Sequence, residues 1–186
     1  MPKLSVIITS VREGRVGEPI AQWFMARAKA HGKFDAQLVD LKQVNLPMVS
    51  EPFHPRLRKY TQDTTKAWSA IVAPSDAFVF ILPEYNYSMP PALVNAVDHL
   101  YHEWNFKACA FVSYGGVSGG TRAMQMAKQL VTAVKMMPMQ EAVPIPFFSH
   151  LMEEGVFKSN EAHDKSAAEM LDELLRWTDA LKTLRQ

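Results

Sequence analysis

Short runs of apolar residues alternate along the chain with longer stretches in which apolar residues recur every three or four positions. The runs are typical of strands buried on both faces, and the recurring positions are typical of helices that pack on a sheet. Five runs are of the strand type: residues 4–8, 36–41, 77–82, 108–113 and 139–143. The alternation predicts an α/β fold with a mainly parallel sheet.

Five helices are expected between and after these strands. Pro19 lies near the start of the first helix, where a missing amide proton costs little. The second is marked by apolar residues at helical spacing: Leu57, Tyr60, Trp68 and Ile71. The others lie around residues 93–101, 121–135 and 171–181. Because crossovers between parallel strands are right-handed, we expect a doubly wound, five-stranded parallel sheet of order 2-1-3-4-5 with helices on both faces.

The chain has 186 residues, of which 48% are hydrophobic and 21% are charged, as is usual for globular proteins. Two domains would each have fewer than about 100 residues, a size at which a single core is hard to bury. No Gly/Ser-rich or charged spacer divides the chain. We therefore expect a single domain over residues 1–186.

Charge and cysteine content limit the partners and the compartment. Twenty Lys and Arg against nineteen Asp and Glu give a net charge of +1, which offers no basic field for nucleic acid. The single Cys109 cannot form an internal disulfide, and no signal-peptide core follows Met1. No apolar run approaches the roughly 20 residues of a membrane-spanning helix. We expect a cytoplasmic protein with no nucleic-acid partner and no membrane partner.

A polar loop follows the first strand and leads directly into a helix. It contains Ser10, Arg12, Arg15, Val16 and Gly17. Because a helix N-terminus has free amides and a dipole that attract anions, and because hydroxyl and guanidinium groups bind phosphate oxygens, this loop predicts a phosphate site. It is neither a Walker A loop nor a Gly-x-Gly-x-x-Gly loop. The alternative is a solvated turn.

A stiff loop follows the third strand. Residues 83–91 include three prolines and two tyrosines, and they begin with Pro83, Glu84, Tyr85 and Asn86. Restricted backbone beside aromatic rings favours a planar ligand. The alternative is a Pro-rich connector whose tyrosines pack on a neighbouring subunit.

A glycine-rich loop follows the fourth strand. Residues 113–120 begin with Ser113, Tyr114, Gly115 and Gly116, and they hold four of the eight glycines. Ligands of open parallel sheets bind beyond the carboxyl ends of the strands, so these glycines are placed to bring backbone amides against a ligand. The alternative is a flexible link between strand and helix.

Other chemically active residues are given structural roles. His99, His102 and Glu103 lie at helical spacing, but no third set of ligands with zinc-like spacing accompanies them, so no metal site is expected. Asp40 ends a strand and is expected to be a solvated surface group. Tyr101, Trp104 and Phe106 are candidates for aromatic surface at a subunit contact.

The three loops together resemble those of the NADPH-dependent FMN reductase family of flavodoxin-like proteins, which includes quinone, chromate and azo-dye reductases. Ser10-x-Arg12 before Gly17 is similar to the phosphate loop of that family. Pro83-Glu84-Tyr85-Asn86, followed by Asn95-Ala96-Val97-Asp98, is similar to its flavin-ring loop and the helix after it. Tyr114-Gly115-Gly116 is similar to its third loop. Residues 146–160 show the least resemblance.

The resemblance implies a flavodoxin-like homodimer or homotetramer that binds FMN without a covalent bond. Electrons would pass from NAD(P)H to a small acceptor (a quinone, free flavin, azo dye or metal oxyanion) by a ping-pong mechanism, and the chemistry would be that of FMN, with no catalytic side chain. The phosphate ligands would be Ser10, Arg12, Arg15, Val16 and Gly17. The flavin ring would lie between residues 83–86 and residues 113–116. A flavodoxin-like electron carrier and a flavin-binding regulatory module are the alternatives.

Overall fold

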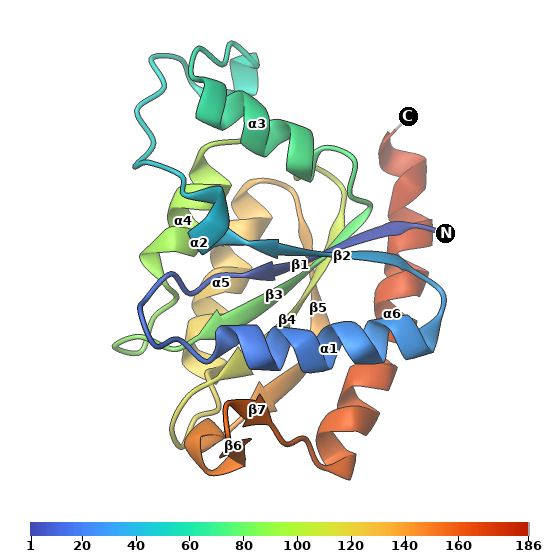
Figure 1. Cartoon of the computed structure of the whole chain (residues 1–186). Helices are drawn as coiled ribbons and strands as arrows, with labels where there is room; N and C mark the ends of the chain where they lie inside the picture. The colour runs from blue at the N-terminus through green and yellow to red at the C-terminus, as the bar shows by residue number, and fades with distance from the viewer. Residues whose placement is uncertain (186) are drawn as a thin grey trace.

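The structure, a computed structural model, describes residues 1–185 and is built around a parallel sheet of five strands (Figure 1). The strands are β1 (Lys3–Ile8), β2 (Asp35–Asp40), β3 (Ala77–Pro83), β4 (Ala108–Tyr114) and β5 (Met137–Ile145). Their order is β2-β1-β3-β4-β5, and each neighbouring pair is parallel. The expected fold class and strand order are confirmed.

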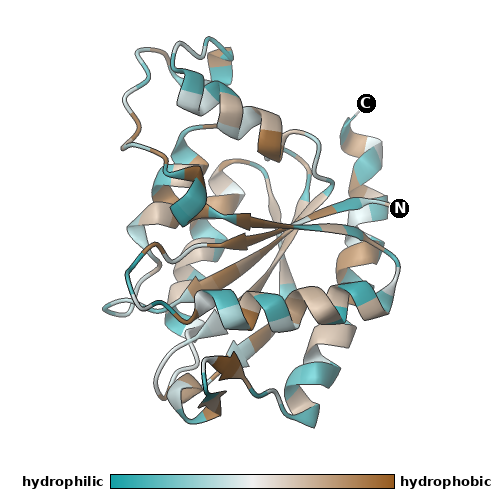
Figure 2. Cartoon of the chain, in the orientation of Figure 1, coloured by the Kyte–Doolittle hydropathy of each residue, from teal (hydrophilic) through white to brown (hydrophobic). Residues whose placement is uncertain are grey.

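Helices cover both faces of the sheet. One face is covered by α1 (Gly17–His31) and α6 (Glu161–Leu181), and the other by α3 (Asp63–Val72), α4 (Pro91–Asp98) and α5 (Thr121–Ala133). A single turn, α2 (Leu41–Val44), follows β2. Figure 2 shows the central strands β1 and β3 as mostly apolar, whereas apolar and polar bands alternate along α1 and α6. The helices therefore bury one side only, as the sequence periodicity predicts.

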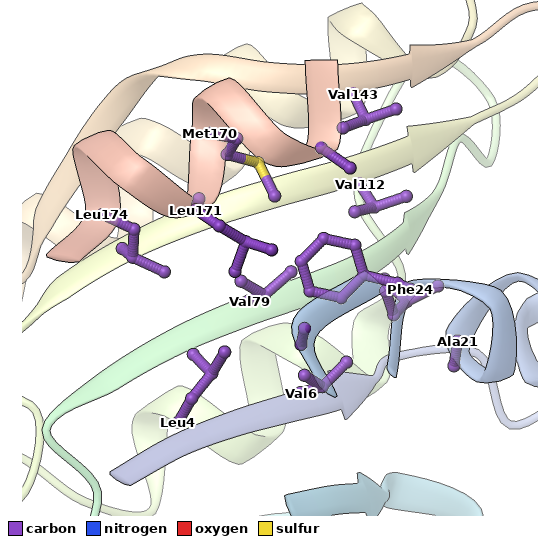
Figure 3. Close-up of a cluster of buried hydrophobic side chains, with 14 of the residues drawn as sticks. Leu4, Val6, Ala21, Phe24, Val79, Val112, Val143, Met170, Leu171 and Leu174 are labelled. Carbon is purple, nitrogen blue, oxygen red and sulfur yellow. The ribbon is translucent and has the colours of Figure 1, made fainter. Parts of the chain in front are cut away.

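The core has two layers because successive side chains of a strand point to opposite faces. Leu4 and Val6 of β1 meet Phe24 of α1 and Leu171 and Leu174 of α6 on one face (Figure 3). All five side chains are fully buried. This packing fixes the start of α1, and hence the first loop, against the carboxyl end of β1.

The second layer is aromatic and corrects one expectation. Trp104 lies edge-on to Phe78 with 4.9 Å between ring centres, and its Nε1 donates to the Val97 carbonyl at 3.2 Å. Trp104 is fully buried and Tyr101 is 8% exposed. The prediction that these two rings offer subunit surface is wrong, because each fills the core below α4. Cys109 is also fully buried, and burial raises the pKa of its thiol.

The second predicted helix is shorter than its apolar spacing suggests. Leu57 ends a 3-10 turn (Pro55–Leu57), and Arg58 then adopts a left-handed conformation with φ 53°. Residues 59–61 form no regular structure and Gln62 is extended, so α3 begins at Asp63. Glu51 accepts hydrogen bonds from the Thr61 and Gln62 amides and holds this entry in place.

The segment after β5 contains structure that the sequence patterns did not predict. A 3-10 helix (Phe148–Leu151) precedes a hairpin of two short strands, β6 (Met152–Glu153) and β7 (Val156–Phe157). Phe157 packs edge-on against Trp23 of α1 with 5.2 Å between ring centres. The segment thereby packs beside the carboxyl ends of the strands, on the face of the sheet that α1 and α6 cover. Within residues 1–185, no helix is both long and apolar enough to span a membrane.

Candidate functional site

Three loops at the carboxyl edge of the sheet surround a cavity of about 360 Å³, a volume typical of small-molecule sites. They join β1 to α1, β3 to α4 and β4 to α5. The lining residues are Arg12, Glu13, Gly14, Arg15, Val16, Pro83, Glu84, Tyr85, Tyr114, Gly115 and Phe148. Eight of the thirteen residues that the sequence singled out are among them. The other five, Ser10, Gly17, Asn86, Ser113 and Gly116, lie behind the wall or beside it.

The N-terminus of α1 opens toward this cavity. Among residues 1–185, no side chain caps the helix at Val16, so its first amides have no intrahelical acceptor and no side-chain cap. A Cβ atom on Gly17 would lie 2.6 Å from Ser10 Oγ and 2.9 Å from Tyr114 Oη. An added Cβ would therefore displace the ends of the Ser10 and Tyr114 side chains, whose hydrogen bond joins the first loop to β4.

Ser10 lies beneath the loop. It is fully buried, and Tyr114 Oη donates a hydrogen bond to its Oγ at 3.3 Å. Burial raises the pKa of the Tyr114 hydroxyl, so the phenol stays neutral at ordinary pH. The hydrogen bond between Ser10 and Tyr114 thus joins the first loop to β4, with Tyr114 in the cavity wall and Ser10 behind it.

Arg15 forms an ion pair that the sequence did not reveal. Its Nη1 donates to the Ser10 carbonyl at 2.7 Å and to Asp40 Oδ1 at 2.5 Å, and its Nη2 pairs with Asp40 Oδ2. Burial tends to raise the pKa of Asp40, but the hydrogen bonds from Arg15 and the Lys42 amide outweigh it, and the net pKa is lowered. The expectation that Asp40 is a solvated surface group is wrong, because only 8% of it is exposed.

Glu84 connects the second loop to the third. Its carboxylate accepts hydrogen bonds from Ser118 Oγ at 2.9 Å and from Arg122 Nε at 2.7 Å. Burial opposes its ionisation, yet the bonds from Arg122 and Ser118 lower its pKa on balance. The Glu84 amide also donates to the Tyr114 carbonyl at 3.0 Å. The two loops are therefore held at a fixed separation.

The third loop is folded tightly on its glycines. Gly120 has φ 82°, and a Cβ atom there would lie 2.7 Å from the Tyr114 amide nitrogen. Ser113 Oγ donates to the Gly119 carbonyl at 2.8 Å. Gly116 differs, because a Cβ on it would meet nothing within 4 Å. Ser113 and Gly120 shape the loop, while Gly115 lies on the cavity wall.

Phe148 is a wall residue that sequence reasoning missed. Its ring lies edge-on to Tyr114 with 5.4 Å between ring centres. The amides of Phe147 and Phe148 donate to the Gly116 and Gly115 carbonyls at 2.9 and 3.4 Å. The available signal was two adjacent aromatic residues just beyond the last strand, at the same edge of the sheet as the three loops.

A larger hollow, of about 600 Å³, includes Tyr60, Glu103, Lys107 and Arg185. Most of its polar groups are paired: Tyr60 and Ser69 donate to Glu103, and Lys107 Nζ donates to the Ala73 carbonyl at 2.9 Å. Arg185 donates from Nη1 to Asp76 at 3.2 Å, while its buried Nη2 has no partner within residues 1–185. No three metal-ligating side chains gather in the part of the chain that the structure describes. His99 instead bonds Thr65 Oγ1 and the Pro47 carbonyl, each at 3.0 Å.

The cavity walls fit FMN, the cofactor that the sequence resemblance implies. An uncapped helix N-terminus and the Arg12 guanidinium suit a phosphate. Tyr85, whose ring centre lies 5.5 Å from the Arg12 guanidinium, and Pro83 suit a flat ring system. Gly17 allows the close approach between loop and strand that brings these groups together.

Two sequence comparisons identify the family. The family model for NADPH-dependent FMN reductase matches residues 2–150. An NAD(P)H-dependent FMN reductase of Schizosaccharomyces pombe is 44% identical over 149 residues, which cover 78% of this chain and 74% of the relative. A second, from a Nectria species, is 30% identical over 195 residues, with 99% and 97% covered.

Solved structures show the same fold. The flavoenzyme FerB of Paracoccus denitrificans, an NAD(P)H:(acceptor) oxidoreductase, superposes with a TM-score of 0.78 at 20% identity, and the match covers 97% of this chain and 98% of FerB. The fold, the arrangement of the three loops and the sequence matches all indicate the same family. The chain therefore belongs to the NADPH-dependent FMN reductase family, and it is an oxidoreductase with FMN as cofactor and NAD(P)H as electron donor.

Proposed function

We propose that the cavity between the three loops holds FMN, and that the enzyme passes electrons from NAD(P)H to a small acceptor: a quinone, free flavin, azo dye or metal oxyanion. The observation that supports this site most is the charge of its wall. Glu13 pairs with Lys42, Arg15 with Asp40 and Glu84 with Arg122. Within residues 1–185, no carboxylate forms an ion pair with Arg12, so the wall has one uncompensated positive charge that suits a phosphate.

In this proposal the phosphate is bound by Arg12 and by the amides of Val16 and Gly17. Ser10 and Arg15 hold the loop in place: Arg15 donates to the Ser10 carbonyl and to Asp40, and so it keeps the loop in the shape that exposes those amides. Asp40 also accepts from the Lys42 amide at 2.9 Å, which fixes the carboxylate that holds Arg15.

The flavin ring is proposed to lie between residues 83–86 and residues 113–116. FMN itself supplies the hydride-accepting and electron-donating chemistry, so the protein needs no catalytic acid or base. Pro83 and Tyr85 support one side of the ring, and Tyr114 and Gly115 limit the other. Glu84 keeps the two sides at a fixed distance through Ser118 and Arg122.

The cavity is at the small end of the range for ligand sites, so donor and acceptor are expected to use the space beside the flavin in turn. A ping-pong mechanism follows. Initial rates measured at several fixed quinone concentrations, with NADPH varied, should give parallel double-reciprocal lines. Intersecting lines would contradict the mechanism, and purified FMN-loaded protein that oxidises NADPH with none of the four acceptor classes would contradict the proposed function.

A further inference from the structure

The second loop ends in a tight turn with an unusual residue at its tip. The amides of Tyr85 and Ser88 each donate to the other's carbonyl at 2.9 Å, and Asn86 and Tyr87 between them have φ of 50° and 65°. Such left-handed values favour Gly and Asn, and they cost other residues about 1–2 kcal/mol. Tyr87 therefore occupies a strained position, and strain of this kind gathers at functional sites.

The Tyr87 ring is held from one side and open on the other. The Arg122 guanidinium lies 3.8 Å from its ring centre, and Arg122 is in turn fixed by Glu84. Despite this contact, 67% of Tyr87 is exposed. The turn projects beyond the carboxyl ends of the strands (Figure 1). The result is an immobilised aromatic face next to a cation, connected through Glu84 to the wall of the flavin cavity.

The chemistry of the donor suggests what this face binds. NAD(P)H is a dinucleotide, and its nicotinamide has to reach the flavin in a cavity of about 360 Å³. The adenosine half, with the negatively charged phosphates, must then lie outside the cavity. A nucleotide base stacks on an aromatic face, and a guanidinium binds phosphate oxygens. Tyr87 and Arg122 provide both groups at the rim.

We propose that Tyr87, backed by Arg122, binds the adenosine half of NAD(P)H and sets the affinity for the donor. This assignment rests on the proposed flavin cavity, because only there does the nicotinamide lie close enough to the turn. Arg122 has two tasks: it fixes the plane of the Tyr87 ring, and it attracts the phosphates beside it. The reacting end of the donor makes no contact with either residue.

The test compares two donors on the FMN-loaded enzyme. Tyr87→Gly removes the ring while suiting the left-handed backbone, so the turn is kept. Its KM for NADPH should rise roughly 5- to 150-fold, the range for loss of one base stack, with kcat unchanged. Reduced nicotinamide mononucleotide, which lacks adenosine, should be oxidised equally well by the variant and the wild type. Tyr87→Phe should behave as wild type.

The matched control is Phe147→Gly. Phe147 is also an exposed aromatic residue with a left-handed backbone, 51% exposed with φ 47°, but it lies beyond β5. Its removal should leave the KM for both donors unchanged. Equal effects of Tyr87→Gly on both donors, or no effect on either, would overturn the assignment.

A binding measurement tests the role of Tyr87 independently of the proposed function. Calorimetric titration of the FMN-loaded protein with ADP-ribose should show binding to the wild type and to Phe147→Gly, and weaker binding to Tyr87→Gly by the same factor as the KM change. Equal affinity of all three proteins would overturn the assignment even if turnover with every acceptor is normal. Absence of turnover, with the expected order of ADP-ribose affinities, would contradict the proposed function alone.

Discussion

Arg12 and Arg15 lie three residues apart in one loop, yet their surroundings give them different tasks. Both line the cavity, but Arg15 is paired with the buried carboxylate of Asp40, whereas the Arg12 guanidinium faces the ring of Tyr85. The sequence could not separate them, because the partner of Arg15 is 25 residues away at the end of the neighbouring strand. Register between β1 and β2, where Ile8 pairs with Asp40, brings the two together.

Replacing Asp40 with Asn tests this division at the scale of a single residue. The side chains of Arg15 and Asp40 are only 10% and 6% exposed, so removing the Asp40 charge leaves the buried Arg15 with only the exposed Glu18 carboxylate, 4.0 Å away. We expect the free energy of unfolding at pH 7 to fall by about 3 kcal/mol. Asp35→Asn, at an exposed position of the same strand, should change it by less than about 0.5 kcal/mol. Urea unfolding of both variants and the wild type measures the difference.

The effect of Asp40→Asn on the free energy of unfolding should depend on pH. The pKa of Asp40 is lowered in the folded protein, so its ion pair with Arg15 stabilises the folded state at pH values above the unfolded-state pKa of about 3.9. This stabilisation is lost as the pH falls through the lower folded-state pKa. The difference in free energy of unfolding between the wild type and Asp40→Asn should therefore become smaller below pH about 4. A stability difference that is constant down to pH 3, or an Asp40→Asn variant as stable as wild type at pH 7, would contradict the stabilising role of the Arg15–Asp40 pair.

At the scale of elements, the strands were predictable and the irregular segments were not. Strands buried on both faces are continuous apolar runs, which located β1, β3 and β4. Shorter apolar runs located the edge strands β2 and β5, which also expose polar residues. The helix expected from Leu57 failed because Leu57 and Tyr60 match the helical period by coincidence, while Arg58 turns left-handed between them. The β6–β7 hairpin was missed because two-residue strands leave no periodic signal. The three site loops were predictable because strand ends place them.

Glycines in the third loop differ in what they require. Gly120→Ala adds a Cβ atom that would lie 2.7 Å from the Tyr114 amide nitrogen, at φ 82°. We expect it to lower the free energy of unfolding by about 2 kcal/mol or more, through left-handed strain and crowding. Gly116→Ala, in the same loop, meets open space and should be near neutral. Thermal unfolding of the flavin-free proteins gives the comparison, and equal effects of the two substitutions would contradict the loop geometry.

For the whole molecule, the exposed apolar residues indicate how copies associate. Met48, Phe53 and Leu57 lie in the segment between α2 and α3 and are 73%, 46% and 56% exposed. Three exposed apolar side chains in one segment favour an interaction surface there, and we predict a homodimer or homotetramer. The variant with Phe53→Asp and Leu57→Asp should shift light-scattering mass toward the monomer. Val156→Asp, at a residue 54% exposed on β7, should not. A monomeric wild type would contradict this prediction.

In the proposed site the three loops hold FMN, with its phosphate at Arg12. Titrating the flavin-free protein with FMN and with riboflavin, which lacks the phosphate, tests it through the quenching of flavin fluorescence. In Arg12→Ala, FMN affinity should fall by about 1–3 kcal/mol, or roughly 5- to 150-fold, with riboflavin affinity unchanged. Unchanged affinity for FMN, or an equal loss for both flavins, would contradict the account.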